Sequence, residues 1–418
     1  MESVSPQSVM NRYLEKYSFR EPQITERPAS DVGIIVVIPV YNEEAFIQSL
    51  ESLANCDIPE CKVEVISVIN SSETEGTEIL ERNLRTLEEA REWSGLQSKE
   101  FIQFHFIHEP ALPKKHAGVG LARKIGMDEA VSRFEMIDQD GIIVCYDADS
   151  MCDANYLVEI ERHFLLHPKT PGCSVHFEHP VSGTEFSEEV YQGIVNYELH
   201  LRYYKEAMEY CRLPYAYHTV GSSMAVRSSA YQKQGGMNKR KAGEDFYFLH
   251  KIIALGGFTN LTTTRVIPSP RSSDRVPFGT GRAIGVWLEE SKEEMETYSF
   301  KSFQEIRRFI EQLPDIYRDE MLGLPPALVP FLEDNNFKEA VRNAQQNSTS
   351  YESFRKRFFV WFDAFKLLKC VHFLRDTAYV DRPITEQCRE LLKTIDPTTD
   401  SPQKASDLLQ LFREKEKG

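Results

Sequence analysis

Apolar runs of strand length recur along the first two thirds of the chain, and stretches with helical periodicity separate them. The run at residues 141–146 lacks polar alternation, which indicates a strand buried on both faces, as in a parallel sheet; residues 33–40 are predicted as another buried strand and residues 63–70 as a further strand. Helices are predicted over 45–54, 77–93, 114–134 and 155–166, and further strands over 101–107 and 173–177. This β-α-β-α-β order predicts an α/β fold with a doubly wound, mostly parallel sheet.

Two carboxylates stand directly after the run that ends at Tyr146. Asp147 and Asp149 lie one residue apart, where ligands of open α/β sheets bind, beyond the carboxyl end of a strand. Two hard oxygen ligands suit Mg²⁺ or Mn²⁺ that carries a substrate diphosphate. The alternative is that Asp147 caps the next helix and Asp149 is solvated, which is the commoner state of an isolated D-x-D.

Two other turns place polar groups at strand ends. Asn42 suits the N-cap of the helix that follows the first strand, with Glu43 favourable in its first turn; a turn at this place could instead contact a nucleotide. Residues 114–124 combine glycines and bases at a helix start, which makes an anion site. It is not a dinucleotide fingerprint, because Arg123 replaces the third glycine. Arg123 either contacts a phosphate or forms a salt bridge on the helix surface.

Two later segments add candidates. Residues 217–227 are predicted as a strand, and Gly221 in its middle would let a ligand approach the backbone. Glu244 and Asp245 open an amphipathic helix, where acidic residues also stabilise the N-terminus by themselves.

Composition narrows the class of protein. A net charge of −15 over 418 residues argues against non-specific nucleic-acid binding, so no nucleic-acid partner is expected. The eight cysteines include no C-x-x-C pair and are interpreted as reduced, mostly buried thiols. The chain shows neither a signal-peptide pattern nor an apolar run of membrane-spanning length. The expected location is cytoplasmic, with peripheral membrane contact left open. His176 and His179 are candidate metal ligands or sheet-face residues.

Taken in order, these segments resemble the family 2 glycosyltransferases with the GT-A fold, over residues 33 to 260. The matching segments are Ile38 to Glu44, Ser72 to Thr77, Gly118 to Gly126, Tyr146 to Asp149, Gly221 to Arg227 and Gly243 to Asp245. Each motif is short, but six in the family's order are specific together. The resemblance implies a GT-A (Rossmann-like) sheet and a hexosyltransferase-type enzyme. Such an enzyme moves a sugar from a nucleotide-diphosphate donor to an acceptor hydroxyl, with inversion.

The resemblance also implies a donor site. In the family pattern Pro39, Tyr41 and Glu43 line the nucleotide pocket, and Arg123 lies near the base or the diphosphate. Asn70 stands where the family often has an aspartate that contacts the base, so the identity of the base stays open.

The same pattern assigns the reaction centre. Asp147 and Asp149 form the D-x-D motif, with Asp149 as the more direct ligand of Mn²⁺ or Mg²⁺. Asp245, beside Glu244, is the candidate general base. These roles suit the chemistry, since the leaving diphosphate needs positive charge and the acceptor hydroxyl needs a carboxylate to take its proton.

The segment at residues 267–282 contains Arg271, Arg275 and Arg282 among glycines, prolines and hydroxyl side chains. A loop of this composition can fold over a diphosphate with its arginines as donors. The alternative is a domain linker whose arginines are solvated.

Residues 285–418 are helical by period. The aromatic and basic stretch at 354–374 is either a helix that lies on a membrane or, the favoured interpretation, a core helix. The predicted division is an N-terminal extension (1–30), a GT-A domain (31–268), an Arg/Gly-rich loop (269–284) and a C-terminal helical domain (285–418).

Three functions are consistent with these sequence features. The first is a metal-dependent glycosyltransferase with a nucleotide-sugar donor and an acceptor that is a glycan, a lipid-linked molecule or a small molecule. The second is a sugar nucleotidyltransferase, but the turn at residues 41–44 is acidic where those enzymes have a basic, glycine-rich loop. The third is a non-catalytic nucleotide-sugar-binding protein, which the presence of Asp147, Asp149 and Asp245 disfavours.

Overall fold

The computed structural model describes residues 6–276, 278–290, 294–319, 323–399 and 401–418, so residues 1–5 and Pro277 of the 267–282 segment lie outside the described residues. The chain forms two compact units. Unit 1 comprises Met1–Phe186 and Thr219–Gly285, and unit 2 comprises Ser187–His218 and Val286–Gly418. The predicted domain boundaries stay a prediction; residues 187–218 fall in unit 2 although they lie within the span predicted for the GT-A domain.

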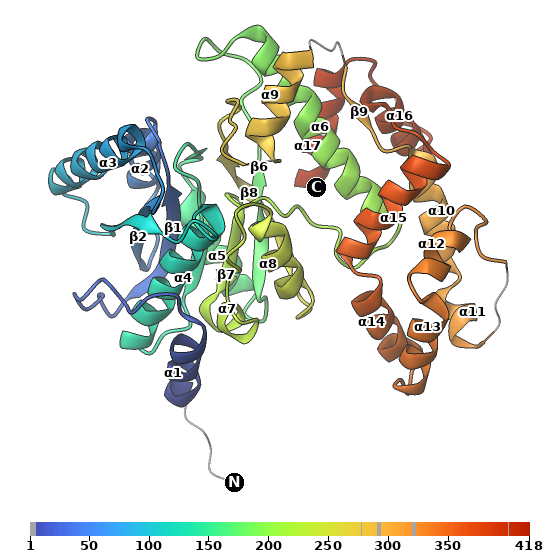
Figure 1. Ribbon diagram of the computed structural model, residues 1–418, viewed down its shortest axis with the longest axis horizontal. Helices are drawn as coiled ribbons and strands as arrows, with labels where there is room; N and C mark the ends of the chain where they lie inside the picture. The colour runs from blue at the N-terminus through green and yellow to red at the C-terminus, as the bar shows by residue number, and fades with distance from the viewer. Residues whose placement is uncertain (1–5, 277, 291–293, 320–322, 400) are drawn as a thin grey trace. The chain divides into compact units, whose positions relative to one another are not determined.

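Unit 1 is built on one eight-stranded sheet in the order β3-β2-β1-β4-β7-β6-β8-β5 (Figure 1). Its strands are β1 (Val32–Val40), β2 (Lys62–Ser72), β3 (Ile102–Leu112), β4 (Ile142–Cys145), β5 (Met151–Cys152), β6 (Gly172–Phe177), β7 (Met224–Arg227) and β8 (Thr259–Ile267). Its helices are α1 (Pro6–Tyr17), α2 (Phe46–Ala54), α3 (Thr77–Gly95), α4 (Val119–Met136), α5 (Tyr156–Leu166), α7 (Ser228–Lys233) and α8 (Glu244–Ile253). With a mostly parallel sheet and a C-terminal helical region, the predicted fold class is confirmed.

The strand order reverses at β1. From β1 the chain moves outward through β2 to β3, and then returns through α4 to place β4 on the other side of β1, with all three pairings parallel. Right-handed crossovers therefore put α2 and α3 on one face and α4 on the other. The carboxyl ends of β1 and β4 diverge at this reversal, which is where open α/β sheets bind ligands.

The central strands are apolar because both of their faces are covered. Ile34 to Ile38 are fully buried, as are Ile143 to Cys145 in the adjacent strand. Gly126 of α4 faces Val37 so closely that a Cβ there would overlap its side chain. This close helix–sheet packing fixes where the amino end of α4 lies relative to the two strand ends.

Two local predictions are wrong. The strand predicted over 217–227 is short and begins only at Met224, because a turn closed by Ser223 N donating to Val220 O (3.0 Å) precedes it. Asn42 does not cap α2, since Ala45 is its N-cap residue. Asn42 instead adopts φ +50° and donates its backbone N–H to Asn83 Oδ1 (2.8 Å).

Unit 2 is helical. Its elements are α6 (Glu188–Tyr210), β9 (Glu296–Thr297), α10 (Phe300–Glu311), α11 (Leu313–Tyr317), α12 (Val329–Asp334), α13 (Phe337–Gln346), α14 (Tyr351–Trp361), α15 (Ala364–Thr377), β10 (Arg382–Pro383), α16 (Ile384–Ile395) and α17 (Ala405–Lys417); α9 (Thr280–Glu290) spans the boundary with unit 1.

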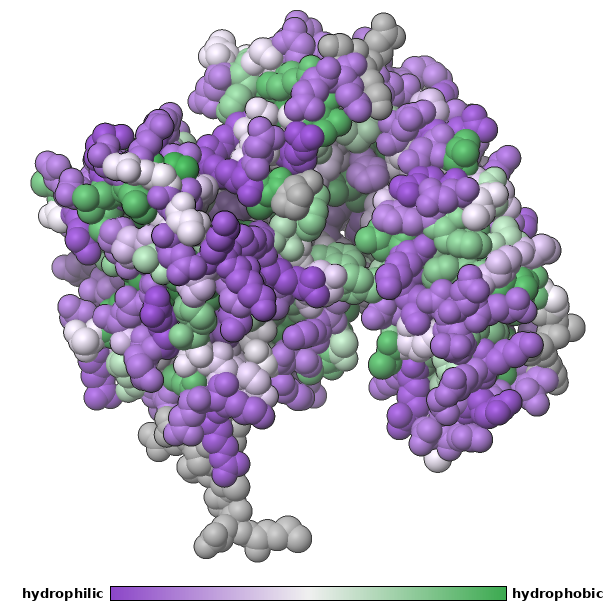
Figure 2. Space-filling view, in the orientation of Figure 1, coloured by the Kyte–Doolittle hydropathy of each residue, from purple (hydrophilic) through white to green (hydrophobic). Residues whose placement is uncertain are grey.

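The aromatic stretch at 354–374 is two helices rather than one. Asp363 caps α15 by accepting the N–H of Lys366 (2.8 Å), so the chain breaks between α14 and α15. Phe354, Phe358 and Phe362 are buried and pack against other rings of unit 2, as the core-helix interpretation expects. Among the described residues no helix is both long and apolar enough to span a membrane. On the face drawn in Figure 2, hydrophobic side chains form only small scattered groups.

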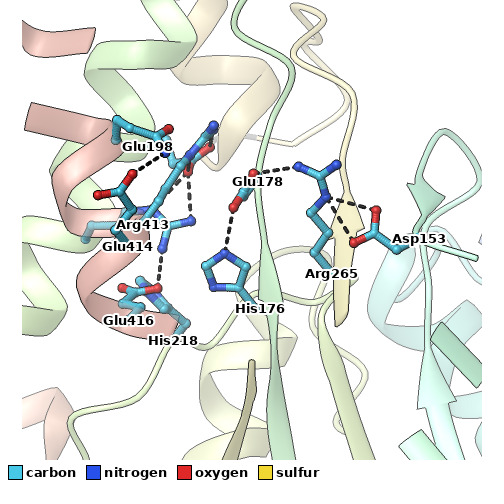
Figure 3. Close-up of polar contacts among 11 residues, drawn as sticks. Asp153, His176, Glu178, Glu198, His218, Arg265, Arg413, Glu414 and Glu416 are labelled. Carbon is cyan, nitrogen blue, oxygen red and sulfur yellow. Dashed lines mark hydrogen bonds and ion pairs between the residues drawn. The ribbon is translucent and has the colours of Figure 1, made fainter. Parts of the chain in front are cut away.

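An ionic network joins α6 to α17 within unit 2. Glu198 accepts from Arg413 Nε (2.7 Å) and from Arg202 Nε (2.9 Å), and Glu416 pairs with both Arg202 and His218 (Figure 3). Arg202 and Glu198 are fully buried, so removing one partner would leave the other charge uncompensated.

Candidate functional site

Arg123, one turn into α4, is the centre of the candidate site. Its Nη2 donates to Asp147 Oδ1 (2.5 Å), and its Nη1 donates to Glu244. The Arg123 side chain is 4% exposed, so the alternative of a salt bridge on the helix surface does not hold. The guanidinium thus joins the turn after β4 to the first residue of α8, two predicted motifs that lie about a hundred residues apart in the sequence.

Gly221 makes room for this arginine. A Cβ at Gly221 would lie 2.7 Å from Arg123 Nη2, closer than a carbon can approach a guanidinium nitrogen without displacing it. The segment between α6 and β7 therefore needs a residue without a side chain here. The predicted role of Gly221 was close approach by a ligand, whereas the group that approaches in this structure is Arg123.

Charge around Arg123 is unbalanced. Asp147, Glu244 and Asp245 surround one guanidinium, so the cluster carries more negative than positive charge. Burial and the neighbouring Asp245 raise the pKa of Glu244 to about 7, against the opposing effect of Arg123. Burial likewise raises the pKa of Asp245, and the carboxylates raise the pKa of Arg123 although its burial acts the other way.

The two acids at the start of α8 have different surroundings. Glu244 is 3% exposed and faces Arg123. Asp245 is half-buried, its Oδ1 accepts the N–H of Phe246 (2.7 Å), and it has no ion-pair partner in the described part of the chain. A carboxylate with access to solvent and a raised pKa can take a proton from a substrate, so the geometry favours Asp245 over Glu244 as a base.

A second ionic cluster lies at the ends of β1 and β4. Arg271 Nε contacts Asp149 Oδ2 (2.8 Å), and Arg271 Nη1 contacts Glu43 Oε1 (3.1 Å). Arg275 Nη1 contacts the other oxygen of Glu43 (3.0 Å). Glu43 is 2% exposed, so two arginines of the 267–282 segment fold onto a buried carboxylate rather than into solvent. The linker alternative therefore does not hold for Arg271 and Arg275.

Asp149 is not the solvated residue that the alternative interpretation expected, because its side chain is only 21% exposed. Burial raises its pKa to about 6, although Arg271 opposes the shift. Asp147 does not cap the next helix either, since the N-cap residue of α5 is Asn155. Both carboxylates of the D-x-D motif are thus held by arginines at the edge of the sheet.

The donor set suits a hard divalent cation that is bound mainly through its substrate. Among the described residues no three His, Cys, Asp or Glu side chains group as a metal site. Mg²⁺ is commonly bound by one or two carboxylates together with substrate phosphates, and Asp147 and Asp149 provide that number. The raised pKa of Asp149 also indicates a negative charge that a cation would stabilise. Arg271 would have to leave Asp149 to expose it.

The other predicted nucleotide-site residues lie around these clusters. Tyr41 OH donates to Glu75 Oε2 (3.1 Å), and burial together with Glu75 raises the pKa of Tyr41 against the opposing effect of Arg275. Pro39 lies in β1, and Asn70 is buried in β2. Arg282 lies in the first turn of α9 rather than in the predicted loop, and it pairs with the exposed Asp274 (3.2 Å), so its place in the site stays a prediction.

The sequence did not indicate one chain of contacts beside the D-x-D motif. Arg265 of β8 holds Asp153 (Nε to Oδ1, 3.0 Å) and Glu178 (Nη1 to Oε2, 2.6 Å), and Glu178 lies 3.0 Å from His176 Nε2 (Figure 3). Asp153 follows β5 closely, so this chain fixes the segment after Asp149 to β6 and β8. His176 is thus bound to a carboxylate. No periodicity could have shown the two pairs of Arg265, because its partners lie 112 and 87 residues away in the sequence.

The comparison with known families decides the assignment. Residues 35–234 match the sequence profile described as "Glycosyl transferase family 2". This segment belongs to glycosyl transferase family 2. The family 2 match covers β1 through α7, which includes Glu43, Arg123 and both D-x-D carboxylates. A search of curated proteins finds no significant match to the sequence.

A search of solved structures finds similarity to two proteins in complex with nucleotide sugars, among others. TarS 1-349 from S. aureus with UDP-GlcNAc is 13% identical, with a TM-score of 0.39 over 92% of this chain and 88% of that one. The mannosyltransferase PcManGT from Pyrobaculum calidifontis with GDP-Man and Mn²⁺ is 15% identical, with a TM-score of 0.34 over 98% and 93%.

Proposed function

We propose that this protein transfers a hexosyl group from a nucleotide-diphosphate sugar to an acceptor hydroxyl, with inversion at the anomeric carbon. The observation that carries the proposal is the fork of Arg123, which holds the D-x-D turn and the start of α8 together at the switch point of the sheet. A diphosphate site and a base are needed side by side for such a displacement, and Arg123 is placed to set that spacing.

The donor is proposed to lie over the ends of β1, β2 and β4. Pro39, Tyr41 and Asn70 would contact the nucleoside, and Arg271 and Arg275 would turn from Glu43 and Asp149 to the diphosphate oxygens. Guanidinium groups bind phosphates in this bidentate manner. Asp147 and Asp149 would hold Mn²⁺ or Mg²⁺, which as a Lewis acid stabilises charge on the leaving diphosphate.

In the proposed reaction Asp245 removes the proton of the acceptor hydroxyl as its oxygen attacks the anomeric carbon. The bond from that carbon to the diphosphate oxygen breaks on the opposite face, and the electron pair leaves with the nucleoside diphosphate. The raised pKa of Asp245 makes it a stronger base than an exposed aspartate, which favours proton transfer near neutral pH. Glu244 acts as a positioning residue through Arg123.

The test is a panel of nucleotide sugars with Mn²⁺, followed first by thermal shift and then by release of nucleoside diphosphate. We expect at least one donor to raise the unfolding temperature, because ligand binding stabilises the folded state by mass action. Asp245→Asn should keep the thermal shift and lose turnover by about 10²-fold or more.

The matched control is Asp140→Asn. Asp140 precedes β4 at the end opposite Asp147 and binds the backbone and hydroxyl of Ser229 (2.7 Å each). It should leave both readouts unchanged. Full turnover by the Asp245 variant would refute the base assignment, and no shift with any donor would refute the donor site. Pyrophosphate formed from a sugar phosphate and a nucleoside triphosphate would instead identify a nucleotidyltransferase.

A further inference from the structure

Two basic loops of unit 1 that lie far apart in the sequence meet beside the candidate base. Residues 113–118 lead from β3 into α4, and residues 238–242 lead into α8. A Cβ at Gly118 would lie 3.2 Å from the Cα of Lys241, and one at Gly120 would overlap the carbonyl oxygen of Arg240. The glycines therefore let the two backbones touch, and a side chain at either position would push the loops apart.

The contact gathers five exposed cations on one surface, here called the basic patch. Its members are Lys114, Lys115, Lys239, Arg240 and Lys241. None of the five forms an ion pair with a carboxylate within the described ranges of the chain. Two of them lie over aromatic rings instead: Arg240 is 3.6 Å from the centroid of Tyr247, and Lys239 is 5.5 Å from that of Phe19.

This concentration of unpaired positive charge is unusual for the chain, which has 64 acidic and 49 basic residues. Glu73 lies at the patch, where it accepts the backbone N–H of Lys114 (2.9 Å), and Glu244 lies beneath it with its carboxylate directed to Arg123. In Figure 2 the surface over the adjoining ends of α4 and α8 is hydrophilic. A cationic surface on an acidic protein attracts anions selectively, because the rest of the molecule repels them.

The amino ends of two helices add to the positive electrostatic potential at the basic patch. Gly118 precedes α4 and Gly243 precedes α8, and neither helix end has a side-chain cap. Their amino ends therefore leave N–H groups and positive dipole ends beside the patch. Helix ends alone would not define a site, but here five side-chain cations converge on the same place.

The position of the patch relates it to the acceptor. Lys241 is four residues before Asp245, and Asn238 Nδ2 fixes the loop by donating to Glu244 O (2.9 Å). The proposed base must touch the acceptor hydroxyl, so the acceptor would bind close to this loop. Phe278, which is 55% exposed and lies against Gly243, adds an aromatic surface there. The donor diphosphate already has Arg271 and Arg275 on the other ionic cluster.

We propose that the basic patch binds phosphate groups of the acceptor, so that the substrate class is a phosphate-bearing molecule with a free hydroxyl next to its phosphate. This inference rests on the proposed function. It concerns the acceptor alone and makes no use of the identity of the donor.

The test measures anion binding by the full chain with two probes. One is fluorescein-labelled inorganic polyphosphate, and the other is phosphatidylcholine vesicles with or without phosphatidylglycerol, an anionic lipid of the kind that attracts polybasic segments. The patch variant is Lys239→Ala/Arg240→Ala/Lys241→Ala. The matched control, Lys62→Ala/Arg85→Ala/Arg91→Ala, removes the same charge from exposed residues of unit 1 outside the patch. A third variant, Lys239→Arg/Lys241→Arg, keeps the charge.

We expect the wild-type chain to bind at least one probe, with an affinity that falls as the salt concentration rises. The patch variant should bind about tenfold or more weakly, and the slope of its log affinity against log salt concentration should be smaller in magnitude by about 2. The control and the arginine variant should bind as wild type. Binding to polyphosphate identifies a soluble phosphorylated acceptor, and binding only to anionic vesicles identifies a lipid headgroup. Binding to neither probe, or equal loss in the control, overturns the proposal.

The donor thermal shift with Mn²⁺ separates this proposal from the proposed function. The patch variant should keep the shift that wild type shows. If it loses the donor shift together with polyphosphate binding, the patch belongs to the donor site and the inference fails while the transferase assignment stands. If wild type binds the anionic probes and no nucleotide sugar, the proposed function fails.

Discussion

Replacing Glu244 by glutamine should stabilise the protein at neutral pH. The glutamine keeps an oxygen that can accept from Arg123 and removes one charge from a cluster of three carboxylates around one guanidinium. The pKa of Glu244 rises from an ordinary value of 4.5 to about 7, and a shift of this size corresponds to about 3 kcal/mol. Because Glu244 is coupled to Arg123 and Asp245, we expect a net gain of about 1–3 kcal/mol, or roughly 3–9 °C in unfolding temperature.

The sign follows from linkage. A folded-state pKa above the unfolded value means that the protonated carboxyl contributes stability below about pH 4.5 and that this contribution is lost as the pH rises to about 7. Wild type and Glu244→Gln should therefore unfold at similar temperatures near pH 5, and the variant should be increasingly more stable up to about pH 7.5.

The assay is thermal unfolding followed by circular dichroism between pH 5 and 8.5. Glu44→Gln is the matched control. Glu44 lies in the turn after β1 and its side chain is 78% exposed, so its replacement should leave the dependence of unfolding temperature on pH unchanged. A difference between wild type and Glu244→Gln that does not vary with pH would refute the reasoning. So would a less stable variant at pH 8, which would mean that attraction to Arg123 outweighs burial.

Three further predictions concern the same clusters. Arg123→Met should destabilise the chain by about 3–5 kcal/mol in urea unfolding, because it leaves buried carboxylates without their positive partner. The loss of stability should be smaller in the Glu244→Gln background; equal losses would mean that the two residues are not coupled. Gly221→Ala should cost about 1–3 kcal/mol by forcing the guanidinium aside and should weaken donor binding in calorimetry, whereas an unchanged affinity would show that the arginine adapts. Arg271→Lys lacks the fork that reaches Glu43 and Asp149 together, so we expect the KM for donor to rise about tenfold with little change in stability; a change in kcat alone would contradict this role.

The central strands of the sheet could be predicted because burial on both faces requires apolar residues at every position. A strand covered on both faces, such as 33–40 or 141–146, is apolar throughout, and a run this short followed by turn residues favours a strand over a buried helix. The residues directly after those strands then follow from the rule that sites lie at their carboxyl ends. This is why Asp147 and Asp149 could be named as a pair.

Other features depend on partners that the local sequence does not contain. The strand predicted from residue 217 begins only at Met224, since the segment before it turns under Arg123. The Arg123–Glu244 pair joins residues 121 positions apart, and the Arg271–Glu43 pair joins residues 228 apart. Charge pairing over such distances is decided by tertiary structure, so a single sequence shows the candidates but not the pairs.

The placement of α6 has a consequence for how the chain is made. This helix leaves the sheet between β6 and β7 and buries Ile194, Leu199 and Tyr203 in unit 2, where α17 at the far end of the sequence is one of its partners. During synthesis α6 emerges long before α17, so β7 and β8 can complete the sheet of unit 1 while the apolar residues of α6 are still uncovered. Exposed surface of this kind invites aggregation of the nascent chain. A fragment that stops at Gly285 should therefore be insoluble alone, and residues 286–418 supplied as a second polypeptide should restore it.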